Sequence, residues 1–178
     1  MLIQGLLDLY QVVGDLELLK LADTLQQNMD EKFWDVEKET GYYIGGAHGD
    51  LKVRVMEDQD GAEPCTNSVA ASLYLDENDH RLLSNGKRIV IVGSASDETV
   101  KLFRNEIRSH YNWNTLVLFL DPTKDNSFIT ERCSVYVDML TVKTPTVFVC
   151  ADFTCGPPIT TLDTLKVEME RLAASPDH

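Results

Sequence analysis

The sequence has few basic residues and no long apolar run, and each shortage excludes a class of protein. Its 178 residues hold 16 Lys and Arg against 29 Asp and Glu, which gives a net charge of −13. Because such a surface repels phosphate groups, we expect neither nucleic acid nor an anionic membrane as a partner. No apolar run reaches the roughly 20 residues that span a bilayer. The opening residues lack the basic flank of a signal peptide.

Cysteine is also scarce. The four cysteines are Cys65, Cys133, Cys150 and Cys155, and they include no Cys-x-x-Cys pair. Because nothing else indicates a secreted, disulfide-built domain, we expect mostly reduced thiols, which favours a reducing compartment. A redox pair of Cys150 and Cys155 is the alternative; we prefer a buried position for Cys150 and a turn position for Cys155. Neither has a histidine or a second cysteine pair at zinc-site spacing, so we expect no metal.

Common catalytic motifs are missing as well. The sequence contains no Gly-x-Ser-x-Gly elbow, no Walker phosphate loop and no His-Glu-x-x-His zinc motif. Gly93 opens a turn where a dinucleotide fingerprint would lie, but Ala95 and Glu98 occupy its second and third glycine positions. We therefore expect no nucleotide and no other cofactor.

The first 30 residues carry two apolar stripes at helical spacing. The stripes are Leu2, Leu6, Leu9 and Val13, then Leu18, Ala22, Leu25 and Met29. Between them Gly14 ends one helix and Asp15 caps the next, so we predict an antiparallel helical hairpin. Residues 51–56 alternate like a short strand, and residues 67–75 predict a short helix.

The pattern changes in the second half of the chain. Residues 88–93 form a continuous β-branched run typical of a strand covered on both faces, and residues 115–120 and 146–150 predict a second and a third buried strand. Asp97 is placed to cap a helix that turns Val100, Phe103 and Ile107 inward, and a closing helix is predicted over residues 162–172. This alternation predicts a small parallel, Rossmann-like α/β sheet over residues 88–178, joined to residues 1–76 by a linker at 77–87.

The first part has a physical difficulty. One hairpin and one short helix cannot cover their own apolar stripes well, and about 75 residues are near the lower limit for a stable core. We therefore expect self-association, or another protein, to cover the open edge of residues 1–76. The alternative is that this region is only loosely folded.

Several segments resemble the spermatogenesis-associated protein 20 family. The most specific is residues 58–64 (DQDGAEP), together with Asn67 and Ser68. The others are residues 33–35, 41–43, 89–93 and 155–160. Members of that family carry an N-terminal thioredoxin-like domain, then an (α/α)6 toroid, then a small α/β region.

The resemblance implies that this sequence matches only the C-terminal portion of that plan. Residues 1–76 would form an incomplete (α/α)6-toroid segment, followed by the small α/β domain. The thioredoxin-like domain, with its cysteine motif, is absent from this sequence. The family pattern tends to place a small hydroxyl residue where this chain has Cys65.

The acidic loop, residues 57–63, is the candidate site for chemistry. Asp58, Asp60 and Glu63 are candidate catalytic residues, because two carboxylates with separated pKa values can act on a sugar as acid and base, or as acid and nucleophile. Toroids of this type bind sugars at the mouth of the barrel. The alternative is a structural loop whose side chains cap turns and the following helix.

Four further residues are candidates for binding the same carbohydrate. Trp34 and Tyr42 are suited to stack on a sugar ring, and Gln59 and Asn67 to bind its hydroxyl groups. The alternative for both aromatic residues is a place in the core.

Three hypotheses of function follow. The first is a fragment or isoform of a spermatogenesis-associated protein 20-like protein, with a structural or interaction role and no catalytic activity of its own. The second is a carbohydrate-active, glycosidase- or epimerase-like toroid with its site near residues 57–63. The third is a thioredoxin-family redox accessory protein, which the missing thioredoxin-like domain weakens. The sequence favours the first.

Overall fold

The computed structural model describes residues 2–46, 53–73, 87–110, 115–151 and 154–174. The chain divides into two compact units, Met1–Arg81 and Leu82–His178. The expected linker residues 77–86 lie outside the described residues, and Lys87 already belongs to a strand. Within the described ranges, no helix has the length and apolar character needed to cross a membrane.

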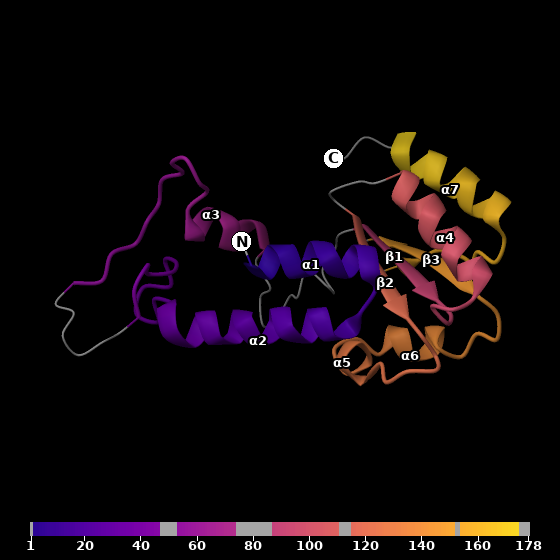
Figure 1. Ribbon diagram of the computed structural model, residues 1–178, viewed down its shortest axis with the longest axis horizontal. Coiled ribbons are helices and arrows are strands. Elements are labelled where there is room, and N and C mark those ends of the chain that lie inside the picture. Colours follow the sequence, from indigo (N-terminus) through magenta and orange to yellow (C-terminus); the bar gives the residue numbers. More distant parts are fainter. Residues whose placement is uncertain (1, 47–52, 74–86, 111–114, 152–153, 175–178) are drawn as a thin grey trace. The chain divides into compact units, whose positions relative to one another are not determined.

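The first unit opens with the predicted helical hairpin. Helices α1 (Leu2–Val13) and α2 (Leu16–Phe33) pack side by side, as Figure 1 shows. Gly14 adopts a positive φ of 74°, which glycine allows at little cost, and its N–H closes α1 on the carbonyl of Tyr10. The Asp15 carboxylate then accepts from the Glu17 N–H at 3.1 Å, as a helix cap does. The predicted stop and cap are both confirmed.

The hairpin leaves much of the α1 stripe in solvent. Leu2, Leu9 and Val13 expose 68%, 46% and 49% of their surface. The buried residue of α1 is instead Tyr10, which lies outside that stripe. The stripe of α2 is covered better, since Ala22 is buried and the other three members are partly covered.

The chain after α2 forms loops tied by isolated bridges. Trp34 bridges Tyr42 and Tyr43 bridges Met56, before helix α3 (Thr66–Leu73). The predicted strand over 51–56 is wrong for its described part, since residues 53–56 form only this one bridge. The physical reason lies in the segment that would pair with it: Gly45 and Gly46 come directly after Ile44, and glycine supports a strand poorly.

The second unit is built on a small mixed sheet. Its strands are β1 (Lys87–Val92), β2 (Thr115–Leu120), β3 (Thr146–Ala151) and β4 (Thr154–Cys155), in the order β2-β1-β3-β4. β1 and β2 are parallel, whereas β3 is antiparallel to both β1 and β4. The three long strands are confirmed, but the prediction of a parallel sheet is wrong for β3. The short strand β4 was not predicted, since Cys155 was expected in a turn.

Connection lengths explain the two directions. Helix α4 (Glu98–Ser109) has 12 residues, about 18 Å, enough to return along a six-residue strand of about 20 Å. Between β2 and β3 there are only α5 (Ser127–Thr130) and α6 (Val135–Met139). Because Val92 pairs with both Leu120 and Thr146, this connection starts and ends at the same edge, and β3 runs back antiparallel.

The core of the second unit lies between the sheet and two helices. Helices α4 and α7 (Leu162–Ala174) cover one face, while α5 and α6 lie at the other (Figure 1). Ile89 and Ile91 of β1 pack with Phe103 and Leu165 from the covering helices. Asp97 caps α4 by accepting from the Thr99 N–H at 2.7 Å, as predicted.

Candidate functional site

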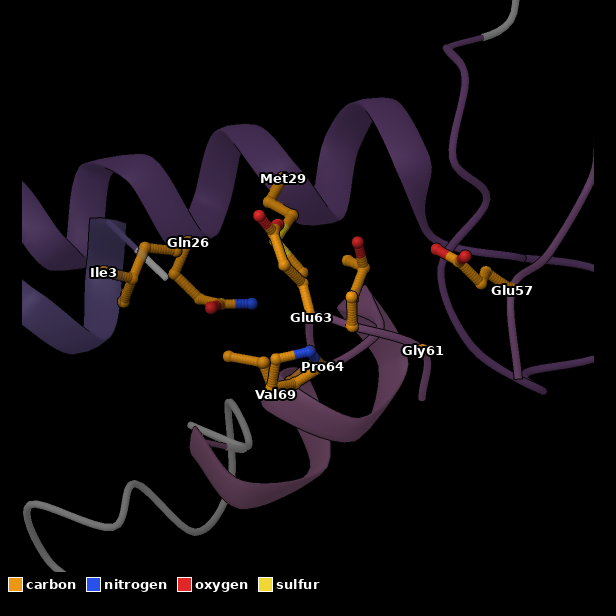
Figure 2. Close-up of a pocket in the computed structure, with 11 residues that line it drawn as sticks. Ile3, Gln26, Met29, Glu57, Gly61, Glu63, Pro64 and Val69 are labelled. Carbon is orange, nitrogen blue, oxygen red and sulfur yellow. The ribbon is translucent and has the colours of Figure 1, made fainter. Parts of the chain in front are cut away.

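The acidic loop borders a cavity of about 500 Å³ in the first unit. Its walls come from α1, α2, α3 and the loop itself (Figure 2). The lining residues are Ile3, Gln26, Met29, Glu57, Gly61, Ala62, Glu63, Pro64, Thr66, Val69 and Ala70.

Two carboxylates reach this cavity, Glu57 and Glu63. Figure 2 shows Glu63 beside Met29, and Glu57 on the side away from Ile3. Both residues are exposed. Of the three predicted catalytic residues, only Glu63 lines the cavity, whereas the exposed Asp58 and Asp60 do not.

Asp60 is used by the loop itself. Its carboxylate accepts from the Cys65 N–H at 2.9 Å, just before α3 begins. The Cys65 N–H, and after it the Ser68 hydroxyl, hold the pKa of Asp60 below its usual value. An ionised Asp60 that fastens the loop to the first turn of a helix matches the structural alternative.

Cys65 takes the position of a helix-capping residue. The Ser68 N–H donates to the Cys65 Sγ at 3.3 Å, and Sγ lies 3.2 Å from the Ser68 Oγ. A hydroxyl residue performs the same task at helix starts. Buried Cys65 therefore has a structural role.

Asn67 joins the loop to the chain after α2. Its Oδ1 accepts from the Tyr42 N–H at 2.7 Å, and its Nδ2 donates to the carbonyls of Tyr42 at 3.0 Å and Glu57 at 2.9 Å. Gly41 makes this approach possible: it has a φ of 147°, and a Cβ there would lie 2.6 Å from the Asn67 Oδ1. With three hydrogen bonds made, the Asn67 amide is committed to the fold.

Tyr42 lies in the interior of the first unit, which was the alternative to a sugar-binding position. It is 4% exposed, its hydroxyl donates to Asp30 Oδ1 at 2.5 Å, and its ring meets Trp34 edge to face at a centroid distance of 5.0 Å. Trp34 is half-buried. Gln59 is exposed and lies outside the cavity lining. Stacking of a sugar on Tyr42 is therefore excluded in this conformation.

Gln26 is a cavity residue that the sequence analysis did not select. It is buried, and its Nε2 donates to Asp30 Oδ1 at 2.8 Å and to the Tyr42 hydroxyl at 3.1 Å. The sequence did hold a signal for Gln26. It lies one helical turn after Ala22, so a polar amide occupies the inward side of α2.

Asp35 anchors the turn after α2 and was also not selected. Its carboxylate accepts from the N–H groups of Glu37 and Lys38 and from the Thr40 hydroxyl. Burial opposes ionisation, but these hydrogen bonds, led by that of Thr40, keep the pKa of Asp35 below its usual value.

The cysteines depart from the sequence-based expectation. Cys150 and Cys155 form a disulfide with an S–S distance of 2.07 Å, so the expectation of reduced thiols is wrong for this pair. The β3–β4 pairing places the two residues directly opposite, with Cα atoms 4.0 Å apart. Cys65 and Cys133 are free. Among the described residues, no three His, Cys, Asp or Glu side chains are grouped to hold a metal ion.

Comparisons with known proteins identify partial relatives. An uncharacterized protein of Caenorhabditis elegans is 28% identical over 202 residues, which cover 93% of this chain. Spermatogenesis-associated protein 20 is 44% identical over 71 residues in Mus musculus and 42% identical in Homo sapiens, covering 39% of this chain. The chain is thus homologous to spermatogenesis-associated protein 20 over a 71-residue part. It spans 27% of the length of the nematode protein and 9% of the mammalian proteins.

Two other comparisons add little. No family model matches the sequence. Chloroplastic thioredoxin z aligns with 70% of this chain and 100% of its own, at 10% identity and a TM-score of 0.33. A likeness at that score assigns no fold.

Proposed function

We propose that this chain is a fragment or isoform of a spermatogenesis-associated protein 20-like protein, with a structural or interaction role and no catalytic activity of its own. Homology over 71 residues supports the relationship. The observation that supports a structural role without catalysis is the hydrogen bonding of the acidic loop. Asp60 and Asn67 hold this loop to the fold.

The loop geometry argues against a pair of catalytic carboxylates. Hydrolysis of a sugar needs two carboxyl groups facing one bond, about 5 to 10 Å apart, in environments that separate their pKa values. Asp60 is bonded to Cys65, and Asp58 lies outside the cavity. Glu57 and Glu63 both reach the cavity, but both are exposed.

In this proposal residues 1–76 are a segment of an (α/α)6 toroid. The hairpin of α1 and α2, followed by α3, is the kind of unit from which such a ring is assembled. The exposed apolar residues of α1 are then the surface against which neighbouring hairpins would pack.

For the isolated chain, the proposed partner of that surface is a second copy. Leu2, Leu9 and Val13 lie on one side of α1, and Asp8 is the single charged residue of this helix. Two α1 faces can therefore meet with little repulsion, even though each chain carries a net charge of −13.

A turnover assay tests the proposal. The chain is incubated with a panel of aryl glycosides and with reducing sugars, and we expect no hydrolysis or epimerisation above buffer. Turnover that Glu63→Gln abolishes, while Glu170→Gln on the exposed surface of α7 leaves it unchanged, would contradict the proposal and establish a catalytic loop.

A second candidate function is carbohydrate binding without turnover. It is favoured by the cavity, which combines two carboxylates with apolar walls from Met29 and Val69. Sugar binding should raise the unfolding temperature of the chain by an amount that grows with the logarithm of the ligand concentration. Glu63→Gln should abolish that shift; an equal shift in the variant would place any sugar elsewhere.

A further inference from the structure

Three residues form a row across three strands of the second unit. Arg88 of β1 pairs directly with Cys150 of β3, which pairs directly with Cys155 of β4. Residues directly opposite each other in antiparallel strands point to the same face of a sheet. Arg88 and the Cys150–Cys155 disulfide therefore share one face, the face from which Tyr136 of α6 reaches Arg88.

Arg88 is a buried charge that has no counter-charge among the residues that the structure describes. It is 7% exposed, and its Nη1 donates to the neutral hydroxyl of Tyr136 at 3.3 Å. Its Nε has no hydrogen-bond partner, and within the described residues Arg88 takes part in no ion pair. Burial raises the pKa of Tyr136 despite the nearby Arg88, so this hydroxyl does not neutralise the guanidinium.

Such an arrangement is costly while the disulfide is intact. A guanidinium stays protonated at any ordinary pH, and a buried cation without an anion destabilises a fold. Reduction of the disulfide would create a thiol at Cys150, directly opposite Arg88. A neighbouring arginine favours the thiolate form of a cysteine, and a stabilised thiolate makes a disulfide easier to reduce.

Cys150 and Cys155 differ in solvent exposure. Cys150 is 1% exposed in the interior strand β3, whereas Cys155 is exposed on the edge strand β4. Because exchange needs a thiolate to approach along the S–S axis, the accessible target is the sulfur of Cys155. The leaving sulfur is then that of Cys150, beside Arg88.

We propose that Cys150–Cys155 is a thiol–disulfide exchange site for thiol reductants, with Cys155 as the sulfur attacked and Arg88 stabilising the departing thiolate of Cys150. It is independent of the acidic loop and of the function proposed for the first unit.

The electron balance is that of ordinary exchange. A thiolate RS⁻ attacks the Cys155 Sγ, the Cys150–Cys155 bond breaks, and its electron pair leaves on Cys150. A second thiolate then attacks the R sulfur of the mixed disulfide and releases Cys155, which takes up a proton. Two thiolates are oxidised to RSSR, and the protein disulfide is reduced to a thiol at Cys155 and a thiolate at Cys150.

A redox titration tests the role of Arg88. The full chain is equilibrated with glutathione buffers at one pH, thiols are trapped by alkylation, and the reduced fraction is read by mass spectrometry. Since one pKa unit of charge stabilisation corresponds to a tenfold change in equilibrium, Arg88→Met should make the disulfide about tenfold harder to reduce. Arg88→Lys should recover much of the loss, and the surface change Arg171→Met should have no effect. Equal equilibria for Arg88→Met and the unaltered chain would overturn the proposal.

A second measurement does not depend on folding of the Arg88 variants. The unaltered chain is exposed briefly to glutathione, quenched with acid and digested, and the mixed disulfide is located. We expect glutathione on Cys155. Glutathione on Cys150, or a chain purified without a Cys150–Cys155 linkage, would overturn the proposal. The buried Cys150 and the free thiol Cys133 are mapped in the same digest.

Discussion

Asn67 and Tyr42 hydrogen-bond to each other in both directions, although 25 residues separate them in the chain. The Tyr42 N–H donates to the Asn67 Oδ1 at 2.7 Å, and the Asn67 Nδ2 donates to the Tyr42 carbonyl at 3.0 Å. This reciprocal pair connects the start of α3 to the segment after α2. The amide that sequence reasoning assigned to a sugar instead fastens two loops together.

Replacement of Asn67 should therefore lower stability. Asn67→Ala leaves the Tyr42 N–H and two carbonyls without their partner, and we expect the free energy of unfolding of the first unit to fall by about 1–3 kcal/mol. Urea unfolding, followed by the fluorescence of Trp34 and by circular dichroism, measures the change. The matched control is Gln59→Ala in the same region, which is exposed and should change stability little. Equal effects of both changes would contradict the role of Asn67.

Gly41 and Gly5 should respond to alanine in opposite ways. Gly41 has a positive φ, and a Cβ there would meet the Asn67 Oδ1, so Gly41→Ala should destabilise by more than about 1 kcal/mol. Gly5 lies inside α1 with open space around it, and Gly5→Ala should stabilise by about 0.5–1 kcal/mol. Thermal unfolding of the two variants decides this; the same sign in both would contradict it.

Acid should weaken the first unit through Asp35 and Asp60. Both carboxylates have a pKa below the usual value in the folded chain. Their stabilising effect is therefore full above the unfolded pKa of about 3.9, and it is lost as the pH falls through the lower folded values. The advantage of the unaltered chain over Asp60→Asn in chemical unfolding should shrink over that acidic range. A stability difference between the unaltered chain and Asp60→Asn that grows as the pH falls would contradict this prediction.

The α1 surface predicts self-association of the isolated chain. Light scattering should show a dimer, and Leu9→Asp should shift it toward the monomer, because the change places a charge in the apolar contact. Val36→Asp is the control, since Val36 is 80% exposed and lies outside α1. A chain that is monomeric at every accessible concentration would refute the proposed contact.

Local features were predictable where one short-range interaction decides them. Asp15 and Asp97 precede their helices as capping residues do, and each accepts the expected N–H. The run 115–120 is a strand over the predicted residues, because a continuous apolar run of this length favours a strand without knowledge of the partner strand. The inward face of α4 was likewise predicted from Val100, Phe103 and Ile107.

Features that depend on distant partners were not predictable. The direction of β3 follows from a connection that stays at one edge of the sheet, and the pattern of residues 146–150 is the same for either direction. The Cys150–Cys155 disulfide depends on the pairing of β3 with β4. In the candidate site, the sequence selected a loop that borders a cavity, but it did not distinguish Asp60 and Asn67, which hold the loop, from Glu63, which lines the cavity.

Amide hydrogen exchange tests the central claim, that the acidic loop is a structural element held by Asp60 and Asn67, most directly. The Tyr42 N–H donates to Asn67 and the Cys65 N–H donates to Asp60. Both amides should exchange far more slowly than that of the exposed residue Gln59, and Asn67→Ala should remove the protection of Tyr42. Exchange of Tyr42 and Cys65 as fast as that of Gln59 would contradict the claim and leave these side chains available to a ligand.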